Sequence, residues 1–181
     1  MVLTPALRGL FGIEADALRH SLSVHPQIPA TWDSADLRNV PVGGDRFDLK
    51  LRRSSGKLIV EATSPEPQIL CLNAETSCTS ARSHRAELSL PAIEMELPHS
   101  LPHPGTPTRQ SKVISQVERE GSATFELEGQ GSETLEVPLR LNRENVKVSG
   151  AAIVSGIVSS KLRVAFPAGE GYQTRKVTFT W

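Results

Sequence analysis

Short runs in which apolar and polar residues alternate limit this chain to a fold built from β-strands. In the run 135–141, leucine and valine occupy every second position, between Glu136, Pro138 and Arg140. Similar alternation occurs in the runs 18–24, 47–52, 57–62, 124–128, 162–166 and 177–181. Because successive side chains of a strand point to opposite faces, each run predicts a strand with one buried face.

Clusters of glycine, proline, serine and asparagine separate these runs, as at 54–56, 129–132 and 168–171. The thirteen prolines and thirteen glycines do not suit a helical bundle. About a dozen short strands with this punctuation predict an all-β fold, and we favour an antiparallel β-sandwich. One short helix is predicted near the N-terminus, over residues 5–10, with Thr4 as its N-cap and Pro5 in its first turn.

The expected organisation is a hinge segment over residues 1–16, helical or extended, followed by one β-sandwich domain over 17–181. The segment 97–107 holds four prolines, so it suits neither a helix nor a central strand and is expected to form a long loop. It could instead divide two subdomains, 1–97 and 108–181. We favour one sandwich, because the second part alone has only about seventy residues, which is small for an independent core.

Charge and hydropathy exclude several classes of partner and cofactor. Lysine plus arginine equals aspartate plus glutamate, at 20 each, so there is no basic excess to predict nucleic-acid binding. No apolar run is long enough to predict a membrane span, and the first residues do not resemble a signal peptide. His99 and His103 lie in the proline-rich segment, so no metal site is predicted. We expect no cofactor.

Two cysteines, Cys71 and Cys78, leave two interpretations open. A disulfide across a short turn is one, and closing so small a loop would contribute about 2 kcal/mol. The other is two unrelated small residues, one on a strand and one in a loop, because sequence spacing alone does not establish disulfide geometry.

Three pairs of glutamates at i, i+2 spacing are candidates for catalytic carboxylates: Glu94/Glu96, Glu118/Glu120 and Glu126/Glu128. On a strand, each pair would lie about 6.5–7 Å apart, close to the spacing in inverting glycosidases. The residues between two of the pairs, Met95 and Leu127, are apolar and would face the core, so we assign the glutamates to solvated faces. No nucleophile elbow, nucleotide loop or metalloprotease motif is present, and we predict no catalytic residue in this chain.

The N-terminal third carries a more specific pattern. It consists of PQIPATWD at 26–33, LRNVPVGG at 37–44, RFDL at 46–49 and GKLIVE at 56–61. Over roughly residues 3–65 this resembles the C-terminal all-β domain of bacterial (α/α)6-barrel glycoside hydrolases, the group that includes α-L-rhamnosidases and glycogen-debranching-like enzymes. No part of the motif is catalytic in that group. The resemblance therefore implies a parent glycoside hydrolase and does not make this chain an enzyme.

The resemblance implies an accessory domain that packs against an upstream catalytic barrel and stabilises it. Leu7, Leu10, Phe11 and Ile13 would form the interface with the barrel. The localisation of the chain is left open by its sequence, and a periplasmic or secreted parent is one option.

The alternative is a free-standing module that binds carbohydrate or another protein, with Tyr172 and Trp32 as the candidate glycan-binding rings. These two aromatic residues fall in turn regions, whereas the phenylalanines of the alternating runs fall on predicted core faces. A third option is a sandwich hydrolase or lyase, which would need a cleft that joins carboxylates from separate strands.

Overall fold

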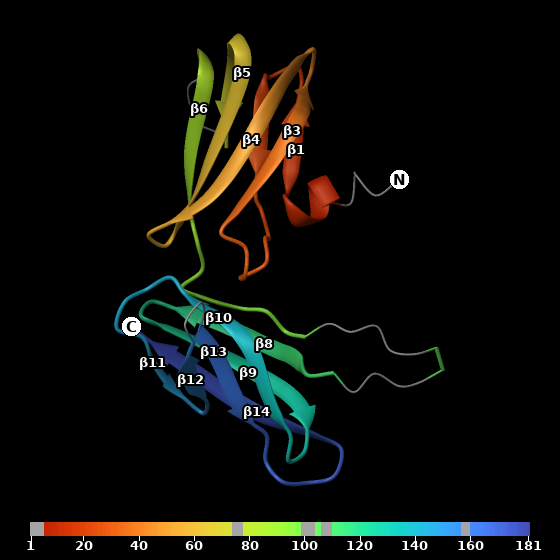
Figure 1. Cartoon of the computed structure of the whole chain (residues 1–181), viewed down its shortest axis with the longest axis vertical. Helices are drawn as coiled ribbons and strands as arrows, with labels where there is room; N and C mark the ends of the chain where they lie inside the picture. Colours follow the sequence, from red (N-terminus) through yellow and green to blue (C-terminus); the bar gives the residue numbers. More distant parts are fainter. Residues whose placement is uncertain (1–5, 74–77, 99–103, 106–109, 157–159) are drawn as a thin grey trace. The chain divides into compact units, whose positions relative to one another are not determined.

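The chain is all-β, as the alternating pattern predicts. The computed structural model describes residues 6–73, 78–98, 104–105, 110–156 and 160–181. Within these residues it contains fourteen strands and one five-residue π-helix, η1 (Ala6–Leu10). The chain divides into two compact units, Met1–Leu90 and Pro91–Trp181, which differ in colour in Figure 1. In the described part, no helix has the length and apolar character needed to cross a bilayer.

The first unit is built on one six-stranded sheet with the order β1-β2-β5-β4-β3, and β6 also pairs with β5. Its strands are β1 (Ile13–Asp16), β2 (Ser21–Val24), β3 (Ser34–Val42), β4 (Asp45–Ser54), β5 (Lys57–Leu72) and β6 (Thr79–Ser89). The pairings are antiparallel except that of β2 with β5, which is parallel. β1 and β3 stand at opposite ends of the order and still contact each other, so the sheet curls around its own core.

Strand β5 pairs with three strands along its length. Residues 57–63 lie between β4 and β6, whereas Cys71 and Leu72 pair with β2. The register against β6 shifts between Thr63 and Gln68, where Pro65 and Pro67 lie. Proline has no N–H to donate to a ladder, so the pairing breaks there and resumes beyond the bulge. The core of the unit consists of Phe11, Ile13, Leu22, Val24, Ile28, Val40, Val42, Phe47, Leu49, Leu51, Leu58, Val60, Ala62, Leu70, Leu72 and Ala86.

One predicted strand begins later than its alternation suggests. The alternation over 18–24 predicts an extended strand throughout, but residues 17–20 form a turn and β2 starts at Ser21. The cause is Asp16, whose Oδ1 accepts hydrogen bonds from the backbone N–H groups of Leu18 (3.0 Å) and Arg19 (3.2 Å). Aspartate favours such local turns over a ladder. As a result, the Leu18 side chain is 95 % exposed.

The second unit has two four-stranded antiparallel sheets, with the orders β12-β13-β10-β7 and β11-β14-β9-β8. Its strands are β7 (Ile93–Met95), β8 (Lys112–Arg119), β9 (Ser122–Gln130), β10 (Thr134–Leu141), β11 (Lys147–Ser149), β12 (Ala152–Ser155), β13 (Ser160–Ala165) and β14 (Tyr172–Thr180). Buried residues of both sheets form one cluster, so this unit is a sandwich. The cluster consists of Ala92, Ile93, Ala123, Phe125, Leu127, Leu135, Val137, Leu139, Leu162, Val164, Phe166, Val177 and Phe179.

This organisation differs from the expected hinge and single sandwich. The boundary between the compact units falls between Leu90 and Pro91, and each unit has its own core. The segment 1–16 contributes β1 to the first sheet. Of the proline-rich segment 97–107, residues 99–103 and 106–107 lie outside the described residues.

Candidate functional site

The PQIPATWD turn presents an exposed tryptophan on the first unit. Within the turn, the Trp32 N–H donates to the carbonyl oxygen of Pro29 at 3.0 Å. Ile28 and Ala30 are buried at 7 % and 9 % exposure and anchor the turn to the core. The Trp32 side chain is 41 % exposed. Ile28 and Ala30 thus fix the turn to the core, and the large aromatic side chain of Trp32 reaches solvent.

Arg53 of strand β4 binds the backbone of the PQIPATWD turn. Arg53 donates from Nε to the carbonyl oxygen of Trp32 (2.8 Å) and from Nη2 to that of Pro29 (3.4 Å). Its backbone N–H donates to the carbonyl oxygen of Asp33 at 2.9 Å. Bonds from a charged donor are stronger than neutral ones, so the turn has a defined position on the sheet. A fixed, half-exposed aromatic ring can pack against a protein surface or stack on a sugar.

The predicted interface residues Leu7, Leu10, Phe11 and Ile13 do not share one environment in the structure. Phe11 (9 % exposed) and Ile13 (7 %) belong to the core of the first unit, and Leu10 packs against that core. The side chain of Leu7 lies outside the described residues. Backbone bonds tie the segment down as well, since His25 donates to the carbonyl oxygen of Gly12 at 3.1 Å. Phe11 and Ile13 are thus buried in their own unit and do not form an exposed apolar patch.

Tyr172 begins strand β14 opposite Gln130 and is partly buried. The Lys112 ammonium lies 4.8 Å from the centroid of its ring, which is a cation–π contact. Lys112 also pairs with Glu128 at 3.8 Å. One face of the Tyr172 ring is therefore occupied by a cation. Trp32 and Tyr172 belong to different units, so neither unit combines both rings.

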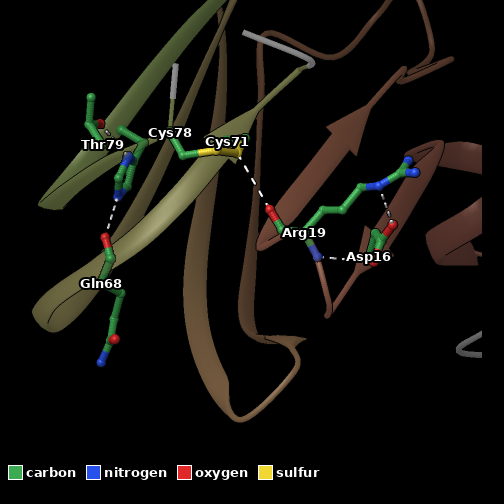
Figure 2. Close-up of a disulfide and its surroundings, with 7 residues drawn as sticks. Asp16, Arg19, Gln68, Cys71, Cys78 and Thr79 are labelled. Atoms are coloured by element: carbon green, nitrogen blue, oxygen red, sulfur yellow. Dashed lines mark hydrogen bonds and ion pairs between the residues drawn. A yellow bond between two sulfur atoms is a disulfide. The ribbon is translucent and has the colours of Figure 1, made fainter. Parts of the chain in front are cut away.

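The two cysteines form a disulfide, shown in Figure 2. Cys71 lies near the end of β5 and Cys78 directly precedes β6, so the bond closes the hairpin between these strands. The Cys71 N–H donates to the carbonyl oxygen of His20 at 2.9 Å, and Cys71 Sγ lies 3.5 Å from the carbonyl oxygen of Arg19. The disulfide thus stabilises the point where β5 changes its partner to β2.

Of the paired glutamates, Glu94, Glu126 and Glu128 have side-chain contacts, and Glu96 directly follows β7. Glu94 accepts a bond from Asn142 Nδ2 at 2.7 Å, and Glu126 accepts one from the Ser115 hydroxyl at 3.3 Å. Glu118 is exposed on β8, and Glu120 is exposed in the turn that follows. Among the described residues, no group of three or more histidine, cysteine, aspartate or glutamate side chains could hold a metal ion.

Sequence reasoning missed a depression on the second unit. It is lined by Gly150, Ala151, Ala152, Arg163, Ala165 and Arg175. The two arginines come from β13 and β14, which belong to different sheets of the sandwich. Arg163 lies in the alternating run 162–166, whereas Arg175 precedes the run 177–181, and nothing in their sequence spacing indicates that they line the same depression.

No protein-family model, no curated protein sequence and no solved structure matches this chain.

Proposed function

We propose that this chain is a non-catalytic accessory module of a bacterial (α/α)6-barrel glycoside hydrolase, and that the surface around Trp32 docks on the barrel. The exposed Trp32, in a turn fixed by Arg53, is the observation that carries the proposal. Tryptophan and arginine are enriched among the residues that dominate binding energy at protein interfaces. A rigid turn also loses little conformational entropy when it binds.

The location of the family-like motifs supports the same proposal. The turn at 26–33, the β3–β4 hairpin and the start of β5 all belong to the first unit. The curled sheet brings these segments around one core, so the part of the sequence that resembles the accessory domain folds as one compact body. Because Phe11 and Ile13 are buried in that core, we assign the proposed docking role to the exposed Trp32 instead.

The test measures binding of the purified chain to a barrel domain from an α-L-rhamnosidase whose own C-terminal β-domain has been removed. Isothermal titration calorimetry, after a thermal melt has shown the barrel to be folded, should detect a complex. Trp32→Ala should weaken it by about tenfold or more, as expected for a central interface tryptophan. Leu18→Ala is the matched control, because Leu18 is an exposed apolar residue of the same unit.

Two outcomes would overturn the proposal: no binding to the folded barrel, or equal binding by the Trp32→Ala variant. A glycan array probed with the same two variants tests the alternative function. Glycan binding that disappears in Trp32→Ala, without any barrel binding, would identify a free-standing carbohydrate-binding module instead.

A further inference from the structure

The depression on the second unit is built around a corner of the chain. Strand β11 pairs with β14 in one sheet and β12 pairs with β13 in the other, so residues 150–151 connect the two sheets. Gly150 has φ +83°, and a Cβ at this position would overlap the carbonyl oxygen of Lys176. Only glycine fits such a corner without strain. The backbone of the corner therefore lies directly against β14.

This corner orients one arginine. Arg175 donates from Nε to the carbonyl oxygen of Gly150 at 3.0 Å. Within the described part of the chain, no carboxylate lies within ion-pair distance of the Arg175 guanidinium, so its positive charge is not compensated. The two Nη groups remain available, and together they match the geometry of a carboxylate.

The second arginine is fixed by a different contact. Arg163 donates from Nε to Glu136 Oε1 at 2.7 Å, and its Nη2 lies 2.7 Å from the same oxygen. Lys161 lies 4.0 Å from the other oxygen of Glu136. These contacts hold the Arg163 side chain at the depression and offset its charge. Arg163 Nη1 has no protein acceptor among the described residues and provides one further donor.

The rest of the lining is small and apolar. Ala151, Ala152 and Ala165 leave a depression of about 360 Å³. This volume is at the lower end of the range for small-molecule sites, which is about 300–1,000 Å³. Methyl groups next to two fixed guanidinium groups suit a ligand with one anionic group on a compact, less polar body.

We propose that this depression binds a single carboxylate group carried by a molecule the size of one sugar or one amino acid. The Arg175 Nη pair receives the carboxylate, Arg163 Nη1 donates a further hydrogen bond, and the alanine methyl groups contact the body of the ligand. A monoanion is favoured over a phosphate dianion, because only Arg175 has an uncompensated charge. This proposal lies entirely within the second unit and does not depend on Trp32.

The experiment titrates the ¹⁵N-labelled full chain with D-glucuronate, N-acetyl-alanine, D-glucose or inorganic phosphate at low ionic strength, followed by amide chemical shifts. At least one carboxylate should produce saturable shifts at 150–152 and around Arg175, and glucose should not. The sugar acid and the amino acid derivative share the carboxylate, so the tighter of the two identifies the source.

Three variants connect the response to the site. Arg175→Gln should weaken binding of the preferred carboxylate by about tenfold or more, since it removes a bidentate ionic contact. Ala165→Leu fills the depression from an exposed position and should weaken binding as well. Arg143→Gln is the matched control, because Arg143 is an exposed arginine of the same unit outside the depression, and its affinity should stay within about twofold of the original.

Circular dichroism melts establish that each variant is folded before its affinity is measured. The proposal is overturned if neither carboxylate binds, if glucose or phosphate binds as tightly as the carboxylates, or if folded Arg175→Gln keeps the original affinity.

Discussion

The ring of Phe166 lies against the backbone of Gly129, so closely that a Cβ at position 129 would overlap the ring. Gly129 is on β9 and Phe166 directly follows β13, so this contact joins the two sheets of the second unit. Phe166 is 5 % exposed and belongs to the core. In a close-packed interior, an added methyl group forces its neighbours out of their preferred rotamers.

We therefore expect Gly129→Ala to lower the free energy of unfolding by about 1–3 kcal/mol, although alanine in a strand is ordinarily preferred to glycine. Urea unfolding followed by circular dichroism measures the change. Gly44→Ala is the control, because a Cβ at position 44 meets nothing within 4 Å and should have little effect. Equal stability of the Gly129→Ala variant and the original chain would show that the Phe166 ring is free to move aside.

Removal of the disulfide should destabilise the first unit. Cys71 and Cys78 are seven positions apart, and the cross-link restricts the unfolded chain over a short loop, so its loss should cost about 2 kcal/mol. Urea unfolding of the Cys71→Ala/Cys78→Ala variant gives this value. The oxidised original chain should lose stability when a reductant is added, whereas the double variant should not respond. A reductant effect of the same size in both proteins would count against the prediction.

A buried histidine bridges the bulge of β5. His84 is 6 % exposed, and its Nε2 lies 3.2 Å from the carbonyl oxygens of both Gln68 and Ala81. Carbonyl oxygens only accept, so Nε2 donates, and Thr79 Oγ1 lies 3.4 Å from the other ring nitrogen. The Phe47 ring packs edge-to-face at 6.2 Å.

His84→Ala should therefore lower the free energy of unfolding by about 2–4 kcal/mol, because it removes buried hydrogen bonds and leaves a cavity. His84→Phe keeps a ring of similar size and removes only the hydrogen bonds, so its loss should be smaller. Urea unfolding of both variants measures the two contributions. If the two variants are equally destabilised, the filling of the cavity contributes nothing.

The pKa of Glu87 lies below its ordinary value. The main cause is the hydrogen bond from Lys57 to the carboxylate, and the next is the nearby positive charge of Lys57; Arg85 contributes in both ways as well. Lys57 Nζ lies 2.7 Å from Glu87 Oε2. Lys57→Met should raise the pKa of Glu87 towards its ordinary value, as followed by ¹³C NMR of the side-chain carboxyl carbon. Lys50→Met, at an exposed lysine on the neighbouring strand β4, should leave that pKa unchanged.

The sign of the effect on stability follows from the direction of this shift. A carboxyl whose pKa is lowered by folding contributes stability above its unfolded-state pKa, and that contribution is lost as the pH falls through the lowered pKa. The difference in stability between the original chain and Lys57→Met should therefore shrink in acid. A difference that grows as the pH falls would contradict the role given to Lys57.

Much of the fold could be predicted from the alternating runs alone. In β4 and β10, alternation predicted both the strand and its buried face, since Phe47, Leu49, Leu51, Val137 and Leu139 are buried. It failed at 18–24, where the Asp16 side chain forms a local turn that competes with extension. Periodicity reports which face of a strand is apolar but not which strand lies next to it. The division into two cores depends on such pairings. The proline-rich segment indicated it only as the less favoured alternative, with a boundary later than the one between Leu90 and Pro91.

The same limit applies to the candidate sites. The apolar character of Phe11 and Ile13 indicated that they are buried, but their partners turned out to be the core of their own unit. The PQIPATWD pattern drew attention to Trp32, whereas its exposure and its contact with Arg53 needed coordinates. Arg163 and Arg175 line the same depression because the two sheets connect at Gly150, and residue spacing in the sequence does not reveal such a long-range relationship.

The pairing of β5 with β2, β4 and β6 has a consequence for how the first unit comes apart. The ladders of β2 and β4 both depend on β5, so opening β5 should expose the amide protons of β2 and β4 to solvent in one shared event. The edge strand β3 pairs with β4 and has no ladder with β5, so it can fray by itself. The kinetic resistance of this unit to proteases would then depend on one strand that passes through its centre.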